Sequence, residues 1–194
     1  ECKSLEKVNI PEGITSIGNK AFYGCNFVEA FAIPAGVTYI GSEAFVNCRN
    51  FVEIVIPAGV EEISERAFRW CVGLTSVIIP ESVTSVGKEA FEGCTALKEV
   101  TYTLGKTGFS SSAFKNCVGY KMILLPNESV TEIYSVTSFS GAEEIVLPEG
   151  IVAIKDNAFC GMTKLKKVSF PSTLVSIGIS AFENTGITEA ILPE

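Results

Sequence analysis

Apolar side chains recur along this chain with a fixed period. Phenylalanines at steps of 23 residues form two series, Phe22, Phe45, Phe68, Phe91 and Phe114, then Phe159 and Phe182. A repeat of roughly 20–30 residues is typical of a solenoid, in which each repeat forms one coil and stacks on the next. We therefore expect one elongated domain over residues 1–194, built from about eight coils.

Each repeat contains two apolar patterns. In residues 74–80, Val77 and Ile79 alternate with outward positions, which predicts a short strand with one face in the core, ended by proline. Val83 and Val86 predict a second, shorter extended segment, and the Ala-Phe pair that follows predicts a helical or 3₁₀ turn. The expected fold is a mainly-β solenoid with a parallel sheet along one side and short helical or 3₁₀ turns elsewhere.

The repeat is disturbed in the middle of the chain. Thr103 stands where other repeats have proline, and Phe139 lies 25 residues after Phe114 and 20 before Phe159. We expect residues 101–145 to be the irregular part of the solenoid. Two interpretations stay open, a degenerate repeat under weak constraint and a functional bulge.

One repeat carries a family resemblance. Residues 10–25 read I-P-E-G-I-T-S-I-G-N-K-A-F-Y-G-C, and this pattern resembles the BspA-like (treponemal-type) leucine-rich repeat, found mainly in bacterial cell-surface proteins. The resemblance implies a right-handed leucine-rich superhelix. It also implies an extracellular or cell-surface protein that works in binding or adhesion, which is an argument by analogy.

The composition and motifs of the chain argue against several classes of function. The net charge of −7 argues against nucleic acid or an anionic membrane surface as partner, since both require a basic patch. The sequence has no histidine and no phosphate-binding glycine motif, and no apolar run long enough to span a membrane. The acidic doublets Glu61-Glu62 and Glu143-Glu144 point to opposite faces of extended segments. We therefore expect no enzymatic activity, no cofactor, no metal site and no membrane insertion of this segment.

Cysteines keep the same period as the phenylalanines. Six of them are 23 residues apart, namely Cys2, Cys25, Cys48, Cys71, Cys94 and Cys117, and only Cys160 is out of register. This spacing predicts a column of buried, reduced thiols, because a free cysteine behaves as a small apolar residue. Disulfides between coils are allowed by distance, but six equivalent thiols define no unique pairing.

The outward positions of the predicted strands give a candidate binding surface. One column is apolar and contains Val55, Ile78, Leu124 and Val146, and the column beside it contains Glu53, Glu99 and Glu144. An exposed apolar stripe with an acidic rim would suit a protein partner with basic groups, such as a host or matrix protein, with a glycan as the second choice. Strand propensity alone could also place β-branched residues there.

The opposing hypothesis is a structural spacer, which presents another domain and binds nothing itself. A spacer would show a uniformly polar outer sheet. Neither end of the sequence has the polar pattern of a solenoid cap, so we expect the segment to be part of a longer chain.

Overall fold

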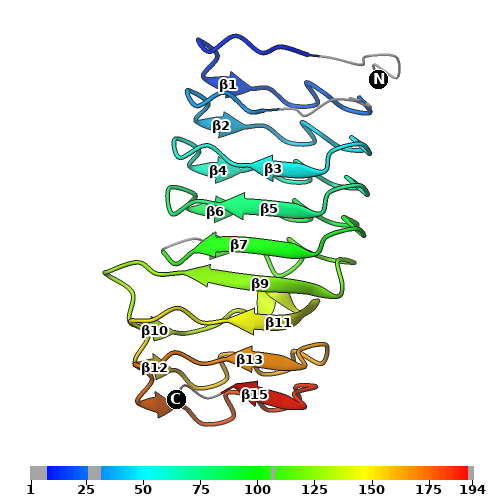
Figure 1. Cartoon of the computed structure of the whole chain (residues 1–194). Helices are drawn as coiled ribbons and strands as arrows, with labels where there is room; N and C mark the ends of the chain where they lie inside the picture. Colours follow the sequence, from blue (N-terminus) through cyan, green and yellow to red (C-terminus); the bar gives the residue numbers. More distant parts are fainter. Residues whose placement is uncertain (1–7, 26–31, 106–107, 192–194) are drawn as a thin grey trace.

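The structure, a computed structural model, describes residues 8–25, 32–105 and 108–191. The chain winds as a β-solenoid in which successive coils add one strand at a time to parallel sheets (Figure 1). The larger sheet has seven strands, β3 (Glu53–Val55), β5 (Ser76–Ile79), β7 (Glu99–Thr103), β9 (Tyr120–Leu125), β11 (Ala142–Val146), β13 (Lys167–Ser169) and β15 (Glu189–Ile191). The expected solenoid with a parallel sheet along one side is confirmed.

The second apolar pair of each repeat forms a second face of two-residue strands. A five-stranded sheet contains β1 (Ser16–Ile17), β2 (Tyr39–Ile40), β4 (Glu62–Ile63), β6 (Ser85–Val86) and β8 (Gly108–Phe109). A three-stranded sheet contains β10 (Glu132–Ile133), β12 (Ala153–Ile154) and β14 (Ser176–Ile177). Each of these strands buries at most one or two residues. Each coil is therefore held together by side-chain packing between the two faces rather than by the backbone hydrogen bonds of long strands.

Phenylalanine rings form the centre of the stack. Phe68 is fully buried and lies parallel to Phe45 and to Phe91, with ring centroids 5.1 and 5.2 Å apart. Phe91 continues the ladder to Phe114 at 5.0 Å. The 23-residue step fixes this ladder, because the same atom of each coil sits one strand spacing above its counterpart.

The Ala-Phe turns are tighter than a helix. Backbone bonds of the i→i+3 type join Ala90 N to Gly87 O and Cys94 N to Phe91 O. Two residues of most such turns have positive φ, which the sequence did not predict. They form two columns, Lys20, Glu43, Arg66, Glu89, Asn157 and Ser180, and Gly24, Asn47, Trp70, Gly93, Asn116, Gly161 and Asn184.

The predicted cysteine column is buried in the described part of the chain. The thiols of Cys48, Cys71, Cys94 and Cys117 each donate to the carbonyl oxygen of the phenylalanine 26 residues earlier, over 3.1, 3.2, 3.3 and 3.0 Å. Cys160 is only half-buried, as its different register predicts. Cys2 lies outside the described residues.

These thiols are expected to resist modification in the native state. Burial raises the pKa of the Cys48 thiol to about 12, and it holds the pKa values of Cys71 and Cys94 well above the usual range. Labelling with a maleimide at pH 8, followed by peptide mapping, should modify Cys160 first and the column only after denaturation. Rapid native labelling of Cys48 or Cys71 would contradict the buried column.

The raised pKa values of Cys48, Cys71 and Cys94 predict a folded state that is less stable at alkaline pH. A pKa raised in the folded state stabilises the protein fully below the ordinary thiol pKa of about 8.5, and this contribution is lost as the pH rises towards 12.

The irregular stretch interrupts one face only. β7 pairs with β9 and β9 with β11, so the larger sheet is continuous. On the other face, within the part of the chain that the structure describes, no ladder joins β8 to β10, and the 3₁₀ helix η1 (Thr137–Phe139) follows β10. An aromatic cluster fills the break, with the Phe139 ring 4.7 Å from Phe109 and 5.0 Å from Phe114. The structure therefore departs from the regular repeat between β8 and β10.

Tyr120 is a costly feature of this stretch. It is fully buried, and no described residue offers its hydroxyl a hydrogen bond. Tyr120→Phe is expected to raise the free energy of unfolding by about 1–2 kcal/mol, because it removes an unsatisfied buried donor. Urea denaturation would measure the gain. Tyr102→Phe is the control, since the hydroxyl of Tyr102 is not both buried and unpartnered; equal effects would refute the explanation.

Candidate interaction surface

The outer face of the larger sheet carries two columns of side chains. Strand pairing defines an apolar column of outward residues, Val55, Ile78, Thr101, Ile123, Val146 and Ser169. It also defines a charged column beside it, Glu53, Ser76, Glu99, Lys121, Glu144, Lys167 and Glu189. Six of the seven residues that we predicted for this surface therefore lie on it.

Leu124 was wrongly placed on this surface. It pairs with Tyr102 and is 1% exposed, and Ile123 takes the outward position instead. The cause is a lost residue before the strand, since Met122 follows Val100 by 22 positions rather than 23. Side chains alternate between the two faces of a strand, so a shift of one residue exchanges the inward and outward sets.

The apolar column is open at one end. Val55 is 54% exposed, whereas Ile78, Ile123 and Val146 are half-buried by their neighbours. A groove of about 540 Å³ adjoins Val55, and Glu53, Ala32, Ile33, Ala35, Ile54, Pro57 and Ala58 complete its lining. The sheet thus offers an apolar recess with one carboxylate at its margin.

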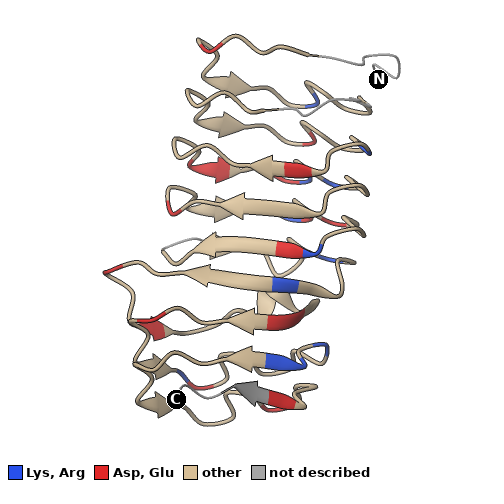
Figure 2. Ribbon diagram, viewed as in Figure 1, with Lys and Arg blue, Asp and Glu red and all other residues tan. Residues whose placement is uncertain are grey.

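The charged column is not uniformly acidic. Figure 2 shows glutamates alternating with lysines along the C-terminal strands. Lys121 Nζ lies 3.0 Å from Glu144, and Lys167 Nζ lies 3.3 Å from Glu189. The predicted acidic rim is therefore neutralised at Glu144. Among the described residues, neither Glu53 nor Glu99 forms an ion pair, so the unbalanced negative charge lies towards the N-terminal end of the sheet.

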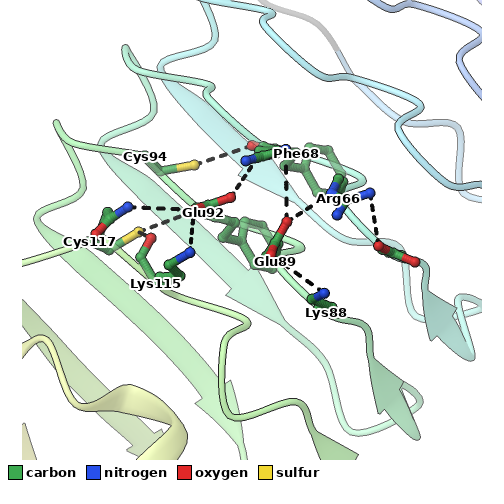
Figure 3. A network of polar contacts seen from close by, with 12 residues as sticks. Arg66, Phe68, Lys88, Glu89, Glu92, Cys94, Lys115 and Cys117 are labelled. Carbon is green, nitrogen blue, oxygen red and sulfur yellow. Dashed lines mark hydrogen bonds and ion pairs between the residues drawn. The ribbon is translucent and has the colours of Figure 1, made fainter.

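A second polar cluster lies on the Ala-Phe turns, away from the sheet (Figure 3). Arg66 Nε donates to Glu89 at 2.8 Å, and this hydrogen bond lowers the pKa of the Glu89 carboxyl. Buried Glu92 pairs with Arg69 Nε at 2.5 Å and with Lys115 Nζ at 3.1 Å. The sequence analysis missed this cluster, although the 23-residue step separates Arg66 from Glu89 and Glu92 from both Arg69 and Lys115, and so predicts that they stack.

The break between β8 and β10 forms a groove of about 460 Å³. Tyr102, Leu104, Phe109 and Phe139 supply its apolar side, and Gly105 and residues 129–136 supply the rest. On its rim Glu132 pairs with Lys155 at 2.8 Å and accepts a hydrogen bond from Tyr134, which lowers the pKa of Glu132. The charges of this pair on the rim therefore balance.

The described residues contain no cluster of three potential ligands that could hold a metal ion. Within the same residues, no helix has the length and apolarity needed to cross a bilayer.

Comparisons with known proteins agree with this architecture. A family model described as the BspA type leucine rich repeat region matches residues 1–121, 61–145 and 137–194, in six copies. The crystal structure of a T. pallidum leucine-rich repeat protein is 25% identical, with a TM-score of 0.53 over 88% of this chain and 70% of that one.

A leucine-rich cell surface protein from Faecalibacterium prausnitzii A2-165 is 29% identical, with a TM-score of 0.35. The match covers 98% of this chain and 54% of that protein, so the chain spans about half of its length. A comparison with curated proteins finds no match.

Proposed function

Because the chain belongs to the BspA-type leucine-rich repeat family, we propose that it is a non-enzymatic binding module of a bacterial surface or secreted protein. Its partner would be a protein, such as a host or matrix protein, held on the outer face of the larger sheet. The observation that supports this proposal is the apolar groove beside Val55, with the Glu53 carboxylate at its margin, which forms no ion pair within the described residues.

The chemistry of this face favours a partner with a small apolar anchor and nearby basic groups. Filling an exposed apolar recess removes apolar surface from water, which favours binding. Glu53 and Glu99 lack cationic partners within the described residues. A Lys or Arg of the bound protein could therefore form an ion pair with each of them, and these pairs would orient that protein on the sheet. The competing spacer function would leave both the groove and these carboxylates without a role.

Binding to matrix proteins is expected to depend on the apolar column. The double variant Val55→Lys with Ile78→Lys keeps the fold, since both side chains point outward, and it should abolish capture of those proteins that wild type retains. Mass spectrometry of proteins eluted from wild type and variant columns would measure this. Leu124→Lys is unsuitable, because that side chain is buried.

Val175→Lys is the matched control, because it adds the same charge at an exposed apolar residue away from the larger sheet. Elution should also occur at lower salt from Glu53→Gln than from wild type. Recovery of the same proteins with the double variant, or of none with wild type, would refute the proposal and favour the spacer.

A further inference from the structure

The ladder of two-residue strands lacks one backbone hydrogen bond between β8 and β10. In the paired strands, the residue after each strand donates its N–H to the last carbonyl of the preceding strand, as Lys155 N does to Ile133 O at 2.8 Å. Tyr134, which follows β10, would donate in this way to Phe109 O of β8. Among the described residues, no carbonyl accepts from Tyr134 N–H, and Phe109 O accepts instead from the Ser138 hydroxyl at 3.3 Å. The donor and the acceptor of one ladder bond are therefore separated.

The aromatic core indicates that this gap is one strand wide. The Phe139 ring lies 5.0 Å from the Phe114 ring, which is one step of the phenylalanine ladder. Val136 N donates to Ala158 O at 3.1 Å, the bond that other ladder phenylalanines make to an alanine of the next coil. Val136 is thus in register with the following coil, and Phe139 supplies one additional ring level. No strand of the described chain accompanies that level, because β8 pairs only with β6 and β10 only with β12.

The missing strand leaves apolar core positions open. Val83 and Val86 are 0% and 1% exposed on a regular coil. The corresponding residues on the two sides of the gap, Val130 and Phe109, are only partly buried. Both line the groove of about 460 Å³, together with the aromatic ring of Tyr102. An apolar groove therefore lies between two strand edges that face each other unpaired.

We propose that this groove binds an extended segment of a partner polypeptide, which adds as a parallel strand between β8 and β10. One N–H of the segment would replace the Ser138 hydroxyl on Phe109 O, and one of its carbonyls would accept from Tyr134 N–H. Main-chain hydrogen bonds of this kind hold peptides that bind by strand addition. An acceptor on one side and a donor on the other match a polypeptide backbone. This site is separate from the outer face of the larger sheet and does not depend on the function proposed for that face.

The neighbouring strands indicate which side chains such a segment needs. On a regular coil, Val83 and Val86 lie three positions apart and both face the core. A segment with the same spacing of two apolar residues would cover Val130 and Phe109 and remove their exposed surface from water. We therefore expect a partner segment with an apolar-x-x-apolar pattern and no charge at those two positions.

A fluorescein-labelled peptide that copies residues 82–88, S-V-T-S-V-G-K, tests the proposal, because it has the sequence of a strand that this face already contains. Fluorescence anisotropy with the full chain should show saturable binding. In the chain, Gly87 N donates to Ile63 O at 2.8 Å, so the equivalent amide of the peptide would donate to Phe109 O. N-methylation of that glycine should weaken binding about tenfold, because it removes this hydrogen bond. Replacement of both peptide valines by serine should abolish binding.

Amide hydrogen exchange locates the bound peptide. Tyr134 N–H should exchange far more slowly when the peptide is saturating, because it gains an acceptor. Gly178 N–H already donates to Ile154 O at 2.7 Å and should not change. Saturable binding without protection of Tyr134 would overturn the proposal, since the peptide would then lie elsewhere.

Protein variants separate this site from the outer face of the larger sheet. Val130→Lys places a charge in the groove and should weaken peptide binding about tenfold. Val55→Lys with Ile78→Lys changes only the other face and should leave peptide binding unchanged. Failure of wild type to bind the peptide would overturn the proposal, and so would equal binding of the N-methylated peptide. The groove would in the latter case take apolar side chains without adding a strand.

Discussion

Truncation of Phe91 to Ala is expected to lower the free energy of unfolding by about 3–5 kcal/mol. The ring is fully buried and stacks on Phe68 at 5.2 Å and on Phe114 at 5.0 Å, both nearly parallel. Its removal loses apolar burial and leaves a cavity between two coils whose spacing is fixed by strand ladders, so the cavity cannot easily collapse. Urea denaturation followed by circular dichroism would measure the loss.

Phe182→Ala provides the matched control. Phe182 is half-buried and has one parallel neighbour, Phe159 at 4.9 Å, so the same truncation should cost only about 1–2 kcal/mol. Equal losses at Phe91 and Phe182, or a loss below about 1 kcal/mol at Phe91, would show that the phenylalanine ladder does not determine stability.

Glu92→Ala is expected to cost about 2–3 kcal/mol, the second largest effect of a single substitution. The Glu92 side chain is only 4% exposed and neutralises both Arg69 and Lys115. Its loss leaves Arg69, which is itself largely buried, with Glu89 at 3.8 Å as its remaining carboxylate. Chemical denaturation at low and high salt would measure the change, and salt should alter it little because the pair is shielded from solvent.

Two further variants test whether the lost buried charge causes the destabilisation by Glu92→Ala. Glu65→Ala removes an exposed carboxylate 2.9 Å from Arg66 and should cost less than about 1 kcal/mol, as exposed pairs do. The double variant Arg69→Met with Glu92→Leu should recover most of the stability, because the destabilising group is the unpaired buried charge. Failure of this rescue would mean that Glu92 acts through the turn geometry rather than through charge.

The periodic parts of the molecule could be predicted from sequence alone. A constant 23-residue step determines both which residues stack and which face the core, so the phenylalanine ladder, the buried thiols and the two strand faces follow from spacing. Cys94 and Cys117 illustrate this, since both donate to a carbonyl one coil earlier, in the same geometry.

The register of β9 and the backbone conformation at Trp70 were decided by tertiary structure. The strand reads Y-K-M-I-L-L, and its last four residues, all apolar, give no alternation to show which of them face inward. Pairing with β7 decided that Leu124 is buried and Ile123 is outward. Trp70 likewise takes a left-handed backbone conformation that its residue type does not predict, because stacking imposes a positive φ at the equivalent position of neighbouring turns.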